Sequence, residues 1–181
     1  MLEPPIRTTG TRVVYQSPWM TVREDDIVYA DGTTSVFGVV AKADFALVVP
    51  RGEGGFWLVN QYRYPIGRRA WEFPQGGWPA GHTGDAEALA RAELAEETGI
   101  TAGRLTHLGR LHEAHGFCTQ AFDVFLAEDL EQGTPAREAT ESDMEHAFVS
   151  DAQFDAMLRA GELWDAPTLA ALTLYRLHAT G

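Results

Sequence analysis

The sequence predicts an α+β, or mixed α/β, fold, because strand-like and helix-like segments follow one another in blocks. Residues 11–40 and 45–64 are rich in β-branched and aromatic side chains, which favour strands. Residues 86–98 have the apolar spacing of an amphipathic helix, and two more helical segments follow residue 150. A chain of 181 residues with 45% hydrophobic residues can fill one core but is short for two typical domains. We therefore expect one sheet covered by helices.

Two hairpins are predicted in the first third of the chain. The runs M-T-V-R-E-D-D-I-V-Y and T-S-V-F-G-V-V flank a turn at Asp31 and Gly32, and Asp-Gly between β-rich runs is a strong hairpin signal. The runs F-A-L-V-V-P and F-W-L-V-N-Q-Y-R-Y flank R-G-E-G-G, and their nearly continuous apolar character is typical of strands buried on both faces. Further strands are expected at residues 105–112, 121–126 and 147–149.

Capping residues set the expected bounds of the helices. Asp85 is a candidate N-cap for the first helix, and Gly99 supplies the C′ position, where a left-handed backbone is favourable. A second helix is expected to begin at Ser150 or Asp151 and to end before Gly161. A third is expected from D-A-P at residues 165–167 to about residue 178. The acidic stretch between residues 128 and 145 has no period of its own and is predicted to be a loop.

Composition excludes several classes of partner. The formal net charge is −12 and no basic stripe is present, so a nucleic-acid partner is not expected. Cys118 is the only cysteine, which excludes an intramolecular disulfide. No run of about 18 apolar residues and no apolar leader segment occurs, so neither a membrane partner nor secretion is expected. A cytoplasmic location follows as the expectation.

Three glutamates near the end of the first helix carry the strongest chemical signal. Spacings of three and four place Glu93, Glu96 and Glu97 on one helix face, where like charges repel by roughly 0.2–0.5 kcal/mol per pair. They also lie at the negative end of the helix dipole. A solvated acidic face is the alternative interpretation. A compensating divalent cation is the interpretation we prefer, with Mg²⁺ or Mn²⁺ as the candidates because hard cations take oxygen ligands.

The sequence around these glutamates resembles the signature of the Nudix hydrolases. That signature reads Gly, five residues, Glu, seven residues, Arg-Glu, a bulky apolar residue, any residue, Glu-Glu, any residue, Gly, and an apolar residue. From Glu93 onward the match is complete in E-L-A-E-E-T-G-I.

Upstream of Glu93 the chain departs from this signature. The loop from Gly76 is two residues longer, His82 stands where the first glutamate belongs, and Ala92 takes the arginine position. In the family, that Glu and Arg are thought to brace the loop against the helix. Glu87 and Arg91, four residues apart, are expected to form a substitute brace.

Two more stretches resemble the ADP-ribose and nucleoside-diphosphate-sugar pyrophosphatase branch of the family. They are N-Q-Y-R-Y-P followed by W-E-F-P-Q-G, and G-E-L-W-D-A-P-T-L-A-A-L near the C-terminus. The resemblance implies an α/β/α sandwich with an extra N-terminal antiparallel sheet. It implies an N-terminal β region at residues 1–41, for dimerisation and as a substrate lid, and a Nudix hydrolase domain at residues 42–181.

The resemblance also implies a set of metal ligands. Glu93 and Glu97 are expected to bind the cation directly. Glu96 is expected to be a further ligand or a catalytic residue that orients water. The main-chain carbonyl of Gln75 or Gly76 is the expected backbone ligand.

A general base is expected from the acidic loop T-E-S-D-M-E at residues 140–145. Glu141 and Asp143 are the candidates, with Glu145 a weaker one. Gln120 stands near a position where the branch often carries a glutamate.

Substrate contacts are implied by the same branch. Arg63 corresponds to an arginine that contacts the substrate's phosphates, a task that suits its planar fork of donors, although a surface ion pair is the alternative. Trp19 and Phe37 fall where relatives place aromatic residues that sandwich a nucleobase. About three strands before Ala41 are too few for an independent core. A homodimer is therefore expected, with Trp19 or Phe37 completing the partner's site.

These observations predict metal-dependent hydrolysis of the pyrophosphate bond of ADP-ribose or a related nucleoside diphosphate sugar. The products would be a nucleoside monophosphate and a sugar phosphate. One alternative is a Nudix hydrolase of a dinucleotide polyphosphate, a coenzyme or an oxidised nucleotide. Another is a non-catalytic Nudix domain that binds a nucleotide, which the departures at positions 82, 92 and 120 favour and the intact E-L-A-E-E-T-G opposes.

Overall fold

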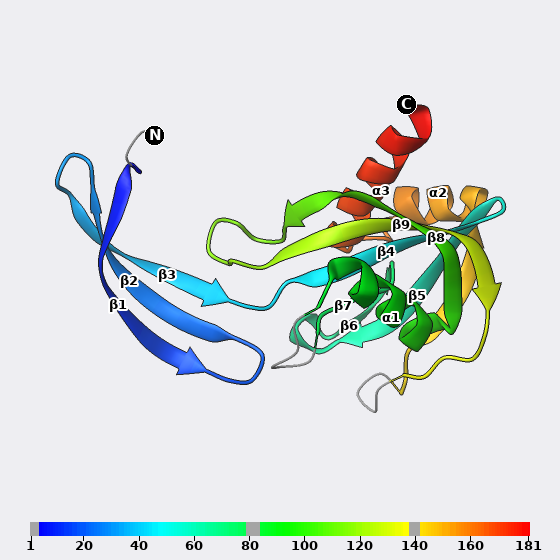
Figure 1. Ribbon diagram of the computed structural model, residues 1–181, viewed down its shortest axis with the longest axis horizontal. Coiled ribbons are helices and arrows are strands. Elements are labelled where there is room, and N and C mark those ends of the chain that lie inside the picture. Colours follow the sequence, from blue (N-terminus) through cyan, green and yellow to red (C-terminus); the bar gives the residue numbers. More distant parts are fainter. Residues whose placement is uncertain (1–3, 79–83, 138–141) are drawn as a thin grey trace. The chain divides into compact units, whose positions relative to one another are not determined.

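The computed structural model describes residues 4–78, 84–137 and 142–181 and divides the chain into two compact units. Unit 1 comprises Met1–Asp44 and His112–Ala121, and unit 2 comprises Phe45–Leu111 and Phe122–Gly181. Figure 1 labels most of their helices and strands. No helix in the described part of the chain is long and apolar enough to cross a bilayer.

Unit 1 is a three-stranded antiparallel sheet in the order β1-β2-β3, formed by β1 (Ile6–Gln16), β2 (Thr21–Tyr29) and β3 (Thr34–Ala41) (Figure 1). The predicted Asp31–Gly32 turn is confirmed: Asp31 accepts a hydrogen bond of 2.9 Å from Thr33 N, and Gly32 has a φ of 86°. The segment 112–121 joins this sheet, since Val40 N donates to Phe117 O at 2.8 Å. Among the described hydrophobic residues of the three strands, Ile27 alone is buried.

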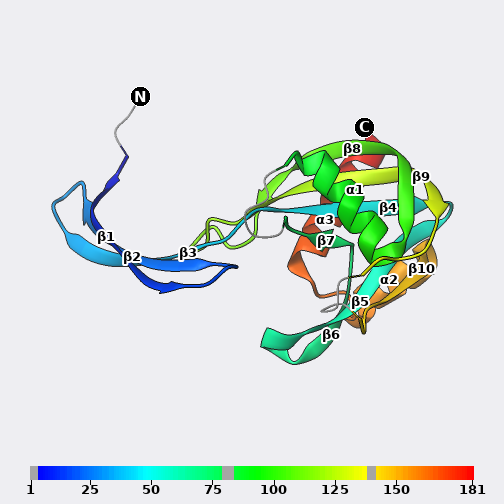
Figure 2. The same cartoon turned by 60° about the horizontal axis from the view of Figure 1, so that its bottom comes forward.

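Unit 2 is built on a seven-stranded mixed sheet (Figure 2). Its main path runs β10-β5-β4-β9-β8, while β6 pairs with β5 and β7 with β4. The strand bounds are β4 (Phe45–Gly52), β5 (Gly55–Arg63), β6 (Arg68–Glu72), β7 (Gln75–Gly76), β8 (Ile100–His112), β9 (Ala121–Gln132) and β10 (Glu145–Ser150). A 3-10 turn at Tyr64–Ile66 separates β5 from β6. Strands β4 and β9 are parallel, and β4 with β5 forms the second predicted hairpin.

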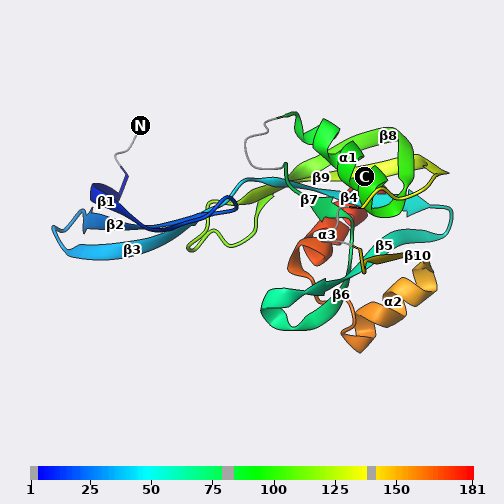
Figure 3. The ribbon, with the colours of Figure 1, turned by 90° about the horizontal axis from the view of Figure 1, so that it is seen from below.

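Helices cover both faces of this sheet, as Figure 3 shows. Alternate residues of β4 enter two cores: Leu47 and Val49 pack with Phe154 and Leu172 of α2 (Asp151–Ala160) and α3 (Ala166–Thr180). Ala46 and Val48 pack with Leu89 and Leu94 of α1 (Ala86–Thr98). The expected α/β/α sandwich with an N-terminal antiparallel sheet is therefore confirmed, and β4 is buried on both faces as predicted.

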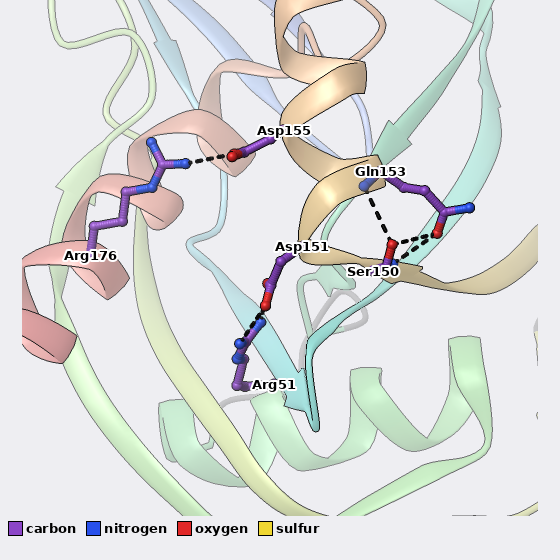
Figure 4. Close-up of polar contacts among 6 residues, drawn as sticks. All are labelled: Arg51, Ser150, Asp151, Gln153, Asp155 and Arg176. Carbon is purple, nitrogen blue, oxygen red and sulfur yellow. Dashed lines mark hydrogen bonds and ion pairs between the residues drawn. The ribbon is translucent and has the colours of Figure 1, made fainter.

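The helix caps agree with the sequence. Asp85 accepts from Glu87 N at 3.4 Å, and Gly99 ends α1 with a φ of 74°. Ser150 is the N-cap of α2 and forms a capping box with Gln153 (Figure 4). The same view shows α2 fixed by two ion pairs, Asp151 with Arg51 of β4 and Asp155 with Arg176 of α3. Helix α3 continues to Thr180, two residues beyond the expected end.

The prediction that the acidic stretch is a loop from residue 128 onward was wrong at its start. Strand β9 continues to Gln132, and β8 begins at Ile100 rather than at residue 105. Arg104 of β8 pairs with Glu128 of β9 at 2.9 Å, and the next side chain, Asp129, is 73% exposed, so the first acidic residues of this stretch belong to a paired strand.

Candidate active site

The loop that precedes α1 meets the helix at Gly76 and Glu93. Strand β7 fixes the position of Gly76, which pairs with Ala46 of β4. A β-carbon at residue 76 would lie 2.4 Å from Glu93 Oε2 and 2.6 Å from Oε1. A residue with a β-carbon would meet the Glu93 carboxylate there, so glycine lets this carboxylate approach the loop backbone this closely.

A second contact joins the preceding residue to the next turn of the helix. Gln75 N donates a hydrogen bond of 3.2 Å to Glu97 Oε2. The Glu97 side chain is almost fully buried, at 1% exposure. Since a buried carboxylate is costly unless its oxygens are bonded, this bond stabilises the approach of loop to helix. Two successive loop residues thus contact the two glutamates expected to be direct metal ligands.

Glu96 lies on the same turn but is exposed to solvent, whereas Glu93 is half-buried. Among the residues that the structure describes, no three His, Cys, Asp or Glu side chains converge closely enough to cage a metal by themselves. What does come together is the carboxylates of Glu93 and Glu97 with the backbone of residues 75 and 76, and carboxylate oxygens suit a hard divalent ion. Mg²⁺ commonly binds one or two carboxylates and completes its shell with water and substrate phosphates.

Arg63 pairs with a carboxylate that sequence reasoning did not select. Its guanidinium contacts Glu72 through NH2 to Oε1 at 2.8 Å and Nε to Oε2 at 3.2 Å. Glu72 has no exposed surface, while the Arg63 side chain is 38% exposed. Burial raises the pKa of Glu72, and the neighbouring Arg63 opposes that rise. The pair is therefore not a surface ion pair. In the sequence, its only signal was a single charged residue, Glu72, between the aromatic residues Trp71 and Phe73.

Gln75 connects this pair to the start of α3. Its Nε2 donates to Glu72 Oε2 at 3.1 Å and to Asp165 Oδ2 at 3.4 Å. Asp165 caps α3 by accepting from Thr168 N at 2.9 Å. Because Gln75 N also bonds Glu97, one residue links the arginine pair, the last helix and the acidic turn of α1.

The described part of the acidic loop is held by Arg69 of β6. Arg69 NH1 contacts Asp143 Oδ2 at 2.7 Å, and NH2 donates to Asp143 O at 2.8 Å. The Asp143 side chain is 56% exposed. Glu145, the weaker candidate, is exposed at the start of β10. Glu141 and His82 lie outside the described residues.

The remaining predicted residues fall elsewhere. Trp19 and Phe37 belong to unit 1, where they are 78% and 41% exposed. Gln120 is buried in the same unit and donates through Nε2 to Ala43 O at 2.7 Å, which is a structural role.

The expected ion pair of Glu87 and Arg91 is present at 2.9 Å. Arg91 NH1 also donates to Ala102 O at 2.8 Å. Within the described residues, this pair therefore braces α1 against β8.

Comparison with known proteins adds sequence and fold relationships. A family model described as NUDIX domain matches residues 41–172, and one described as nucleoside diphosphate sugar hydrolase N-terminal domain matches residues 6–40. The chain is 28% identical over 173 residues to a Bacillus subtilis protein named ADP-ribose pyrophosphatase, covering 94% of this chain and 92% of the relative. It is 28% identical over 184 residues to a Mycobacterium tuberculosis protein of the same name, covering 100% and 88%.

A solved structure supports the fold. It is described as a crystal structure of an ADP compounds hydrolase, and it superposes with a TM-score of 0.86 at 20% sequence identity. The match covers 98% of this chain and 96% of the other. The architecture of both units therefore occurs together in an experimentally determined protein.

Proposed function

Because this chain belongs to the Nudix family, we propose that it is a pyrophosphohydrolase that cleaves ADP-ribose or a related nucleoside diphosphate sugar. The products are a nucleoside monophosphate and a sugar phosphate. The observation that carries the proposal is the double contact of Gly76 with Glu93 and of Gln75 with Glu97. The substrate class is supported by the two ADP-ribose pyrophosphatases, which match nearly the whole chain, and by the match of residues 6–40.

The cofactor we propose is Mg²⁺ or Mn²⁺. Glu93, Glu97 and the main-chain carbonyl of Gln75 or Gly76 would hold it, with Glu96 as a further ligand or a residue that orients water. When bound, the cation supplies charge neutralisation at the phosphoryl oxygens. The role of the chain is to hold two carboxylates and the loop in one place before substrate arrives, which the Gln75–Glu97 hydrogen bond favours.

Arg63 is proposed to contact the diphosphate. Glu72 engages its Nε and one terminal nitrogen, which fixes the plane of the guanidinium. The arginine is partly exposed, so its other donors can meet phosphate oxygens. Glu72 and Gln75 would then orient Arg63 relative to the turn that carries Glu97.

The acidic loop is proposed to supply the general base. Asp143 already pairs with Arg69 through its side chain and its main chain, so acting as base would require that side-chain pair to separate. This favours Glu141, two residues earlier. Glu96, exposed on the helix, is the remaining candidate for orienting or deprotonating the attacking water.

The N-terminal region, residues 1–41, is proposed to dimerise and to cover the substrate of the hydrolase domain, residues 42–181. Its sheet exposes large apolar side chains, including Val13, Tyr15 and Val36, each more than half exposed. In a homodimer, Trp19 or Phe37 would complete the partner's site by stacking on the base. The net charge of −12 supports a small-molecule substrate rather than nucleic acid, and we propose a cytoplasmic location.

The decisive experiment is a substrate panel with Mg²⁺ or Mn²⁺ in which products are identified. It should include ADP-ribose, other nucleoside diphosphate sugars, dinucleotide polyphosphates, coenzymes and oxidised nucleotides. We expect the sugar-linked diphosphates to give the highest kcat/KM. A panel without turnover, combined with measurable nucleotide binding, would instead support a non-catalytic binding domain.

Glu97→Gln tests the metal assignment within that panel. The amide keeps an oxygen that can accept from Gln75 N and relieves repulsion among the glutamates, so the fold should persist. Turnover should fall roughly 100-fold or more. Replacing a residue that only orients a metal ligand typically lowers activity about 10–100-fold, and the loss of a ligand itself should exceed that. Glu87→Gln, an exposed glutamate on the same helix, is the matched control and should stay near wild type. Near-normal activity of Glu97→Gln in saturating Mg²⁺ would remove the assignment.

A further inference from the structure

Arg137 lies five residues after the end of β9, and its guanidinium bonds three acceptors in two separate parts of unit 2. Nε donates to Glu97 O at 2.9 Å, in the last turn of α1. NH1 donates to Met144 O, and NH2 donates to His146 Nδ1 at 2.7 Å, at the start of β10. One side chain therefore links the acidic turn of α1 to the chain on the far side of the acidic loop.

The residues before Arg137 also pack on the end of α1. Ala136 N donates to Glu96 O at 3.0 Å. A β-carbon at Gly99 would lie 2.6 Å from Pro135 N, and Gly99 has a left-handed φ of 74°. The last carbonyls of a helix have no partner within it, and its C-terminal end favours a cation. Ala136 and Arg137 satisfy two of these carbonyls, and Arg137 brings a positive charge to a helix end rich in glutamate.

Arg69 holds the same segment through a second set of hydrogen bonds. It is anchored on β5 by Asn60, donating to Asn60 Oδ1 at 2.5 Å and to Asn60 O at 2.9 Å. From there it contacts both the side chain and the carbonyl of Asp143. The successive carbonyls of Asp143 and Met144 thus accept from two different arginines, and the Met144 side chain is only 2% exposed.

We propose that Arg137 is a positioning residue for the proposed hydrolysis. It fixes the segment 143–146 against the turn of α1 that carries Glu97, so that this segment and the proposed metal ligands keep one relative placement. Glu97 is the shared point: its side chain accepts from Gln75 N and its carbonyl accepts from Arg137. This inference rests on the proposed function, because it assigns Arg137 a role in the same site.

The chemistry of the side chain makes arginine necessary here. A guanidinium has five donors in a rigid plane, so it can reach three acceptors that lie in different directions. A lysine ammonium keeps the charge but offers donors around a single nitrogen, and we expect it to lose at least one of the three bonds. Arg137→Lys therefore separates geometry from charge.

The matched control is Arg91→Lys. Arg91 lies on α1, pairs with Glu87 and, like Arg137, donates to a main-chain carbonyl, that of Ala102. Both variants should be compared with wild type in kcat and KM for a substrate that wild type turns over, in Mg²⁺ affinity by calorimetry, and in melting temperature. Amide hydrogen exchange of residues 142–150 should be measured with and without Mg²⁺.

We expect Arg137→Lys to lower kcat about 10–100-fold, the usual range for residues that position metal ligands. KM and Mg²⁺ affinity should change little, the melting temperature should fall no further than in Arg91→Lys, and amides of 142–146 should exchange faster. Wild-type kcat, or unchanged exchange at these amides, would overturn the inference. If wild type turns over no substrate, the proposed function fails, and the exchange data alone then decide whether Arg137 anchors the segment.

Discussion

The Glu93 carboxylate lies against the α-carbon of Gly76, with room for a hydrogen there but not for a methyl group. A β-carbon at residue 76 would approach three atoms of that carboxylate, Oε2 at 2.4 Å, Cδ at 2.5 Å and Oε1 at 2.6 Å. The contact spans 17 residues of sequence and joins a two-residue strand to a helix. Together with the hydrogen bond from Gln75 N to Glu97, it links the loop to the part of the helix that carries the glutamates.

Gly76→Ala should displace the Glu93 carboxylate and disable the enzyme. The new methyl group occupies the space of the carboxylate, and a shift of about 1 Å at a reacting centre can cost about 100-fold in rate. We expect a loss of that order in kcat/KM, weaker Mg²⁺ binding by calorimetry, and a folded protein by circular dichroism. Gly116→Ala is the control, since no atom lies within 4 Å of a β-carbon there. Equal activity of both variants would mean that Glu93 is not held for catalysis.

Local patterns were sufficient to predict the elements around this contact. Asp85 and Gly99 bound α1 as expected, because capping depends on residues close in sequence. The contact itself depends on β7 pairing with β4, about 30 residues away, and no local signal specifies that register. The ion pair of Glu72 with Arg63 also has no local signal that specifies the partner, because Arg63 lies nine residues earlier, across a turn.

Composition was a weaker guide to the acidic stretch. Glu128 and Glu131 indicated that this stretch is exposed to solvent. An exposed side chain does not prevent its backbone from pairing in a sheet, and β9 continues to Gln132. Arg137 lay within that stretch and was not selected, although an arginine among acidic residues is itself a signal. Its importance arises from Glu97 O and Met144 O, two main-chain acceptors that no side-chain pattern marks.

His146 should make stability depend on pH. Burial and the neighbouring Arg137 cation lower its pKa below the ordinary value of 6.5, so the folded protein keeps His146 neutral. The unfolded chain binds that proton at higher pH. The free energy of unfolding should therefore fall as pH drops below about 6.5, and this loss is complete below the folded pKa.

His146→Gln should remove that contribution, because glutamine keeps a hydrogen-bond acceptor but takes no proton. Denaturant titrations between pH 7.5 and 5.5 should show a flatter pH profile for the variant than for wild type. His115→Gln, which changes an exposed histidine in unit 1, should leave the wild-type slope in place. Parallel profiles for His146→Gln and wild type would contradict the assignment.

The exposed apolar surface of unit 1 predicts a homodimer in solution. Light scattering at micromolar concentration should give twice the mass of the chain. Val13→Arg, at a side chain 58% exposed, should shift the protein toward monomer and lower kcat/KM with it, because the partner would no longer complete the site. Leu177→Arg, at a leucine of α3 that is 66% exposed, is the control. A fully active wild-type monomer would rule out the shared site.

The identity of the general base is the last prediction to test. Because Asp143 is already paired with Arg69, the test can distinguish Asp143 from Glu141. Glu141→Gln should lower kcat by roughly 10²–10⁴, the range for a lost general base, with Mg²⁺ affinity and KM little changed. Asp143→Asn removes a largely exposed side-chain pair, which is worth about 0–1 kcal/mol, while Arg69 still bonds the Asp143 carbonyl.

We therefore expect Asp143→Asn to lower kcat by less than about tenfold. Loss of the general base itself would lower kcat by at least about 100-fold. A reversal, with the greater loss at Asp143, would assign the base to Asp143 and require its side chain to leave Arg69 during turnover. If both variants keep more than about a tenth of wild-type kcat, the loop does not supply the base. Glu96, exposed beside the two buried or half-buried ligand candidates, would then be the residue to replace next.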